Sequence, residues 1–228
     1  MRLYRELGDA AGLGWALVFL GHVAGAQHDD AAGYAHVEES LALFRQVGDQ
    51  AGMARALNAL GETSRSAGDD ARAESFYAEA LALDRAGGNR AGAAIRLHNL
   101  GYVDLHRGAI DQAAARFEES LLIQQELDDA AGVAQGVEGL AATAVAVGRC
   151  RLAAQLFAAA EALRQAAGSW IDVADLPEHE RFQEQARGQL SPRAYEAARR
   201  AGATFSAAEA LARARHELSL PGSPAARP

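Results

Sequence analysis

Three polar side chains that could bind a ligand recur at four-residue spacing in one segment, namely His98, Tyr102 and His106. On a helix this spacing places them on one face, but the two histidines are then about 12 Å apart along the axis. That separation is too large for one metal ion, and no third ligand accompanies them. The pattern therefore favours a polar, ligand-facing stripe over a metal site.

The other catalytic candidates are incomplete. His179 and Glu180 begin like a zinc-protease motif, but the position that needs a second histidine holds Gln183. Cys150 lies at the expected start of a helix and fits a packed thiol better than a nucleophile. The sequence contains no lysine, which excludes a Walker A loop and Schiff-base chemistry. We expect no enzyme, no cofactor and no metal.

Composition narrows the class of partner. The 228 residues carry 30 acids and 22 basic residues, all arginine, for a net charge of -8, which disfavours nucleic acid and anionic membranes. The acidic excess lies within residues 1–168, so acidic groove walls would favour cationic partners. A single cysteine favours the reducing cytoplasm. The most apolar window, residues 15–20, is too short to cross a bilayer. We expect a cytoplasmic protein with no direct nucleic acid binding and no membrane contact.

A repeat of forty residues organises the chain. The sequence has 56 alanines and no proline before Pro177, as long helices require. Ala-Gly pairs begin at residues 11, 51, 91 and 131. A second column holds leucine, followed by glycine in three of four copies: Leu20, Leu60, Leu100 and Leu140, then Gly21, Gly61 and Gly101, with Ala141 last. This register, kept without an insertion, indicates a repeat architecture.

Each period is expected to form two helices. Asp49 can cap the first helix, which Gly68 closes, and Asp69 opens the second. Gly61 is small where facing helices must approach closely, and Tyr77 fills the neighbouring space. One helix pair cannot cover its own apolar face, so the copies must stack. The sequence predicts an all-α, right-handed solenoid of antiparallel helix pairs.

The repeated residues resemble the tetratricopeptide repeat, with lengthened helices. The residues that carry the resemblance are Leu60, Gly61, Gly68, Ala73, Tyr77 and Ala80, and in the next copy Leu100, Gly101, Gly108, Ala113 and Phe117. The phrases at residues 3–9, 97–103 and 118–121 are most similar to the sensor regions of LuxR, SARP and MalT-like bacterial transcription regulators. This resemblance implies a non-catalytic module that binds a protein or peptide. The alternative is a sensor that binds a small inducer.

We predict four segments. Residues 1–7 would end a truncated preceding repeat, residues 8–168 would form four repeats, residues 169–218 would form capping helices, and residues 219–228 would be a disordered tail. The expected terminal helices cover residues 178–190, 191–200 and 206–218. The truncated start suggests a fragment of a longer regulator or, alternatively, a homodimer formed through the uncapped first repeat.

The binding surface should lie in the concave groove lined by the first helix of each pair. Asn99 matches the asparagine that the resemblance places against a peptide backbone, whereas the lysine-based carboxylate clamp is unlikely without lysines. Apolar exposure is expected at Trp15, Ile95, Tyr102 and Leu105. The full set of predicted groove residues is Trp15, His22, Arg55, Asn58, Glu62, Arg65, Ile95, His98, Asn99, Tyr102, Leu105, Gln135 and Glu138.

Overall fold

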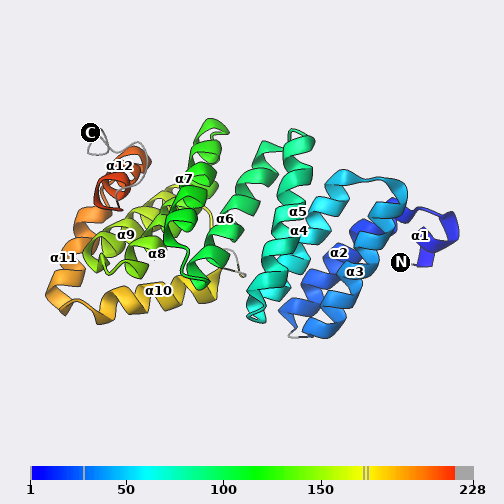
Figure 1. Ribbon diagram of the computed structural model, residues 1–228, viewed down its shortest axis with the longest axis horizontal. Helices are drawn as coiled ribbons and strands as arrows, with labels where there is room; N and C mark the ends of the chain where they lie inside the picture. Colours follow the sequence, from blue (N-terminus) through cyan, green and yellow to red (C-terminus); the bar gives the residue numbers. More distant parts are fainter. Residues whose placement is uncertain (1, 28, 172, 174, 219–228) are drawn as a thin grey trace. The chain divides into compact units, whose positions relative to one another are not determined.

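The computed structural model describes residues 2–27, 29–171, 173 and 175–218. These residues form twelve helices and no strand (Figure 1). The chain divides into two compact units, residues 1–100 and residues 101–228, which we describe separately. The predicted all-α stack of helix pairs is confirmed.

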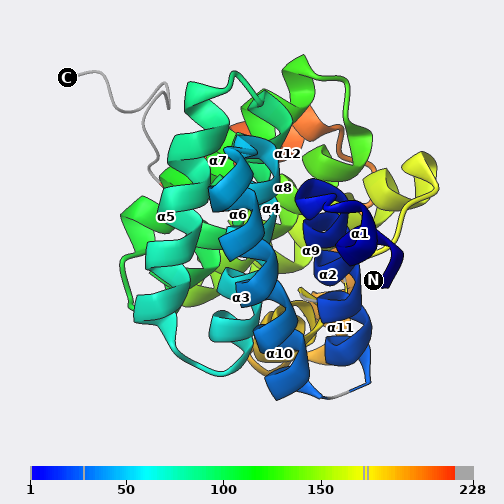
Figure 2. The ribbon, with the colours of Figure 1, turned by 90° about the vertical axis from the view of Figure 1, so that its right-hand side faces the viewer.

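The helix pairs follow one another along the chain, and α2 packs beside α3 as α4 does beside α5 (Figure 2). Unit 1 contains α1 (Arg2–Leu7), α2 (Ala10–Ala26), α3 (Asp30–Val47), α4 (Gln50–Ser66), α5 (Asp70–Ala86) and the first part of α6 (Arg90–His106). Unit 2 contains the rest of α6 with α7 (Ile110–Glu126), α8 (Ala130–Ala146), α9 (Cys150–Ala167), α10 (Leu176–Gly188), α11 (Pro192–Gly202) and α12 (Ala207–Leu218).

The turns recur every twenty residues. Between α1 and α2, and after each of the helices α3 to α9, one residue lies in the left-handed region, a conformation that commonly ends a helix. Glycine takes this conformation without steric cost, and Asp128 is its one non-glycine occupant among the described residues, at φ 55°. The glycines, with φ between 62° and 76°, are Gly8, Gly48, Gly68, Gly88, Gly108, Gly148 and Gly168.

Side-chain caps follow most of these turns. The Asp49 carboxylate accepts a hydrogen bond from the Gly52 N–H at 2.9 Å, and Asp69 accepts one from Arg72 at 3.1 Å. Both predicted caps are confirmed. Four more side chains each accept a hydrogen bond from the backbone N–H three residues later in the chain, namely Asp9, Asp29, Asn89 and Asp129. The helix starts are therefore fixed locally, by residues next to each helix in the sequence.

Paired helices approach each other closely at glycines, which have no side chain. A Cβ at Gly61 would lie 2.5 Å from the ring of Tyr77, and one at Gly101 would lie 2.6 Å from the ring of Phe117. Both rings are fully buried. The predicted fit of Gly61 against Tyr77 is confirmed, and the same arrangement repeats forty residues later.

The terminal helices pack on the last helix pair. Helix α11 lies against α9, and α12 lies against α8 and α9. Arg215 of α12 forms an ion pair with Glu118 of α7 at 2.5 Å. The three predicted helices are confirmed with boundaries shifted by about two residues. Their role as a cap stays a prediction, as does the assignment of residues 1–7, and the tail at 219–228 lies outside the described residues.

Replacing Gly61 by alanine is expected to lower the free energy of unfolding by about 1–3 kcal/mol, because the new methyl group collides with the buried Tyr77 ring. Gly25 is the matched control, since a Cβ there has no atom within 4 Å. Gly25→Ala should raise the same free energy by about 0.5–1 kcal/mol through helix propensity. Urea denaturation measures both. Equal shifts in the two variants would contradict the packing argument.

Candidate functional site

A row of polar side chains crosses the first helices of unit 1. We call it the polar row, and it consists of His22 from α2, Arg55, Asn58 and Glu62 from α4, and Asn99 from α6. Asn99 Nδ2 donates a hydrogen bond to Asn58 Oδ1 at 2.9 Å, and Asn58 Nδ2 donates to Glu62 Oε1 at 2.5 Å. The row thus joins three successive helix pairs, and all five residues belong to the predicted groove set.

His22 links the row to the first pair. Its Nδ1 lies 2.8 Å from the carbonyl oxygen of Val18, and its Nε2 lies 3.4 Å from Arg55 Nη2. A carbonyl can only accept and a guanidinium can only donate, so the contacts fit the neutral imidazole that carries its proton on Nδ1. His22 therefore accepts from Arg55 and holds that side chain across two helices.

A buried arginine lies beneath the row. Arg96 Nε lies 3.2 Å from Asp84 Oδ2, and both side chains are almost fully buried. Burial lowers the pKa of Arg96, while the carboxylates of Asp84 and Glu62 act in the opposite direction. Asn89 Nδ2 donates to the other Asp84 oxygen at 2.7 Å. Arg96 was not among the residues predicted from the sequence, although an arginine stands there at the repeat position that Ala56 holds in the preceding copy.

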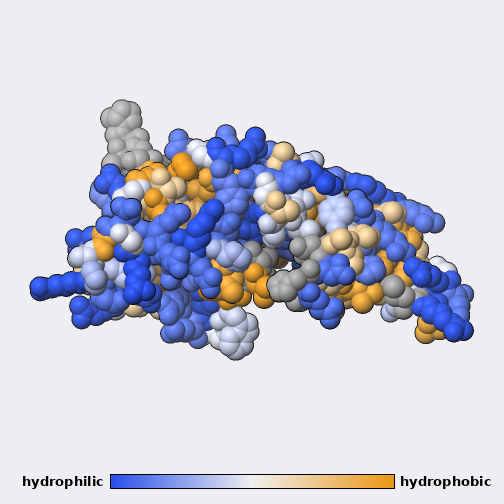
Figure 3. Space-filling view, turned by 90° about the horizontal axis from the view of Figure 1, so that it is seen from below, coloured by the Kyte–Doolittle hydropathy of each residue, from blue (hydrophilic) through white to orange (hydrophobic). Residues whose placement is uncertain are grey.

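Apolar side chains are exposed on the same helices. Trp15 and Ile95 stand at the repeat position of Arg55, and they are 37% and 39% exposed. Their predicted exposure is confirmed. Trp15 packs edge-on against Phe44, which leaves part of the indole at the surface. Phe19, also exposed, was missed, although it falls in the most apolar window of the sequence. Figure 3 shows hydrophobic residues, in orange, interspersed with hydrophilic ones, in blue, on one face.

The corresponding face of unit 2 is covered by the chain itself. Phe182 of α10 stacks on Tyr102, with 6.5 Å between ring centroids, and Phe117 meets the same tyrosine edge-on at 5.2 Å. Tyr102 and Leu105 are buried. The predicted exposure of these two side chains is wrong, because α10 occupies one side of Tyr102 and Leu105 joins the apolar core of unit 2.

Charged groups fasten α10 to this face. Glu138, which is buried, pairs through one carboxylate oxygen with Arg164 and through the other with His179 Nδ1. His106 Nε2 lies 2.6 Å from Glu178 Oε1. His106 is thus engaged by α10, and the predicted ligand-facing stripe faces a helix of the same chain at this position.

The rest of the predicted set lies in varied surroundings. Arg65, His98 and Asn99 are buried in unit 1, Glu138 is buried in unit 2, and Gln135 is half-buried. Nothing in the structure tests whether any of them binds a ligand, so the groove assignment stays a prediction.

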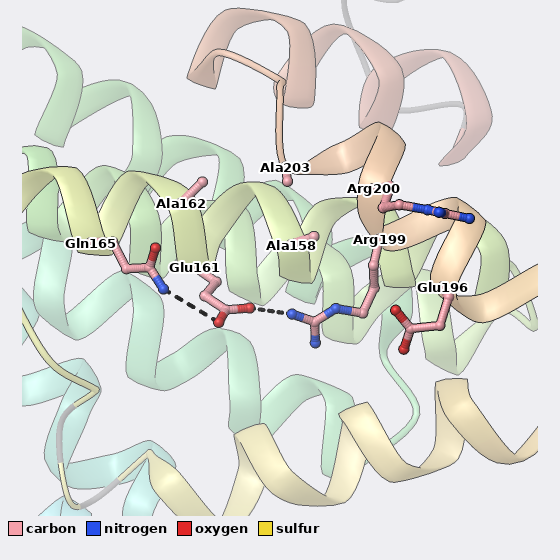
Figure 4. A pocket seen from close by; sticks show the side chains of 8 residues that line it. All are labelled: Ala158, Glu161, Ala162, Gln165, Glu196, Arg199, Arg200 and Ala203. Atoms are coloured by element: carbon pink, nitrogen blue, oxygen red, sulfur yellow. Dashed lines mark hydrogen bonds and ion pairs between the residues drawn. The ribbon is translucent and has the colours of Figure 1, made fainter. Parts of the chain in front are cut away.

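A surface pocket of about 260 Å³ lies between α9 and α11 (Figure 4). Glu161 and Arg199 pair with each other across it, and Glu196 and Arg200 also line it. Burial lowers the pKa of Arg199, but hydrogen bonds to Tyr195 and Glu161 outweigh burial and raise it. Glu161 and Arg199 thus neutralise each other within the pocket.

Across the described residues, no three His, Cys, Asp or Glu side chains gather closely enough to hold a metal ion. None of the described helices combines the length and the apolar character needed to span a membrane.

Part of the chain matches a known protein family. Residues 2–86 match the family model described as tetratricopeptide repeat. No curated protein matches the chain. The matched residues comprise α1 to α5, and α6 to α9 continue the same helix pairs at the same forty-residue spacing.

The two asparagines of the polar row should be energetically coupled. Asn58→Ala and Asn99→Ala are each expected to lower the free energy of unfolding by about 1–2 kcal/mol, because each leaves a buried amide without its partner. The double variant should lose less than the sum, with a coupling of about 0.5–1.5 kcal/mol in urea denaturation. Asn58→Ala combined with exposed Gln46→Ala is the control and should be additive. Additivity in both pairs would contradict the bond.

Proposed function

We propose that this chain, which carries tetratricopeptide repeats over residues 2–86, is a non-catalytic module that binds a protein or peptide through the polar row of unit 1. One observation carries the proposal: polar side chains from three successive helix pairs are held in line by Arg55–His22, Asn58–Glu62 and Asn99–Asn58 contacts. Fixed donors and acceptors lose little entropy when they meet a ligand, which favours binding.

The chemistry of the row suggests the character of the partner. Arg55 is a cation within the row, Glu62 accepts a hydrogen bond from Asn58, and Arg96 beneath the row is paired with Asp84. Trp15 and Ile95 add apolar area at the edge. A partner segment with a carboxylate next to an apolar side chain would complement this surface. A carboxylate bound by Arg55 would differ from the cationic partner expected from the acidic excess of the repeats.

We also propose that the module is the sensor or scaffold part of a bacterial transcription or signalling regulator and acts in the cytoplasm. The similarity of the repeat phrases to LuxR, SARP and MalT-like sensor regions supports the regulatory role. The single cysteine supports a reducing compartment. Neither argument depends on the polar row.

A homodimer through the first repeat is a further proposal. Phe19 and Val23 are 66% and 51% exposed, whereas Ala59, forty residues after Phe19, is buried. Leu3 and Leu7 of α1 are also exposed. A second copy would cover this apolar face by the self-complementary contact typical of two-fold dimers.

Capture experiments test the partner proposal. The immobilised chain is exposed to lysate of its source organism, and each captured protein is quantified for wild type and variants. Arg55→Ala and Trp15→Ala should each reduce capture of a specific partner by about tenfold or more. Arg45→Ala is the matched control, because Arg45 pairs with Glu79 on α3 and α5, away from the row. The purified partner is then titrated against the same variants.

Unchanged capture by Arg55→Ala and Trp15→Ala would remove the row as the binding surface. If no protein is captured specifically and the melting temperature rises only with small metabolites, the inducer-binding alternative is favoured.

Light scattering at increasing protein concentration tests the dimer. Phe19→Glu should weaken association by about tenfold or more, because it places a charge in an apolar contact. Val47→Glu is the control, since Val47 is also exposed but lies at the far end of α3. A wild-type chain that is monomeric at every concentration would contradict the dimer.

A further inference from the structure

In unit 2, helix α10 packs against residues at repeat positions whose counterparts in unit 1 form the polar row. Glu138, which pairs with His179, is eighty residues after Asn58. Tyr102, which stacks on Phe182, is forty residues after Glu62. Equivalent positions thus face a helix of the same chain in unit 2. This helix shows directly what kind of segment the face accepts.

The attachment of α10 relies more on polar pairs than on apolar burial. Of its thirteen residues, only Phe182 and Ala186 are buried. Two contacts between imidazoles and carboxylates, His106 with Glu178 and His179 with Glu138, add to this attachment, and the His179 ring also meets Phe157 edge-on. A helix held in this way can open without unfolding the pairs beneath it.

The face beneath α10 keeps its charges paired when the helix leaves. Glu138 would otherwise be an uncompensated buried charge, which is costly. Arg164 of α9 pairs with the other oxygen of the same carboxylate, so Glu138 retains a partner without His179. His106 can be hydrated in place of its contact with Glu178. Opening costs the ring contacts of Phe182 with Tyr102 and of His179 with Phe157, together with the two imidazole–carboxylate contacts.

We propose that α10 is an intramolecular occupant of a helix-binding face formed by α6, α8 and α9 in unit 2, and that a partner helix displaces it. The partner helix carries a carboxylate and an aromatic ring four residues apart, as Glu178 and Phe182 do, with a hydrogen-bond donor beside the carboxylate in the place of His179. This face is separate from the polar row, so the proposal stands or falls independently of the proposed function.

Each part of that pattern has a counterpart on the face. His106 binds the carboxylate, Glu138 accepts the donor, and Tyr102 receives the ring. The spacing of four residues puts carboxylate and ring on one side of the helix. A partner with additional apolar residues on that side would compete well, because α10 itself buries only two.

Hydrogen exchange on the full wild-type chain tests whether α10 opens by itself. The α10 amides should exchange at least about 100-fold faster than the core amides of α8 and α9, since opening α10 leaves those helices folded. If α10 amides exchange only together with those of α8 and α9, the helix is a fixed part of the fold and the proposal is overturned.

A peptide probe tests the face. A labelled peptide of residues 175–190 of this chain is titrated into the full-length protein and followed by fluorescence anisotropy. Phe182→Ala in the protein should free the face and tighten peptide binding by about tenfold or more relative to wild type. Gln185→Ala is the matched control on the exposed side of α10 and should leave binding unchanged. A peptide that itself carries Phe182→Ala should not bind.

Equal peptide binding by wild type and Phe182→Ala, with both folded by circular dichroism, would overturn the proposal. If Phe182→Ala does not fold, α10 is required for the fold, and the proposal is likewise overturned. Arg55→Ala should leave peptide binding unchanged, which separates this face from the polar row of unit 1.

Discussion

The fold depends on one steric constraint, the close approach of paired helices where one helix has no side chain. Tyr77 fills the space over Gly61, and Phe117 does so over Gly101. Protein interiors tolerate little extra volume, so the ring and the missing side chain must occur together. Because this contact fixes the distance within a pair, it also fixes which side chains meet between pairs. Arg55 can reach His22 only because both pairs follow the same register.

Equivalent positions of the repeat form different surfaces in the two units. Position 58 and its equivalents hold asparagine, histidine and glutamate in successive copies, at Asn58, His98 and Glu138. In unit 1 the asparagine belongs to a row of hydrogen bonds, and in unit 2 the glutamate attaches a helix of the same chain. The backbone is repeated, but the chemistry that it presents is set by single substitutions at fixed places. A solenoid can therefore carry an open face and a covered face on the same framework.

Local features could be predicted from the sequence. A glycine followed by aspartate, as at Gly68 and Asp69, specifies a turn and a cap through neighbours in the chain, so helix boundaries were foreseeable. The burial of Tyr102 was not, because it depends on Phe182, eighty residues later, in a helix that follows no repeat period. Asn58 and Asn99 were placed in the groove set by their spacing, but their mutual hydrogen bond depends on side-chain orientation that spacing does not specify.

The left-handed turns at twenty-residue intervals have a consequence for how such a gene can change. Each turn and cap is specified by adjacent residues, and Tyr77 and Phe117 each meet a glycine sixteen positions earlier, at Gly61 and Gly101. Loss or duplication of a forty-residue block would rejoin complete helix pairs in register. A length change of any other size would place a ring opposite the wrong backbone. Recombination between copies can thus lengthen or shorten the array while leaving every junction intact. The length of the binding face can therefore change readily during evolution.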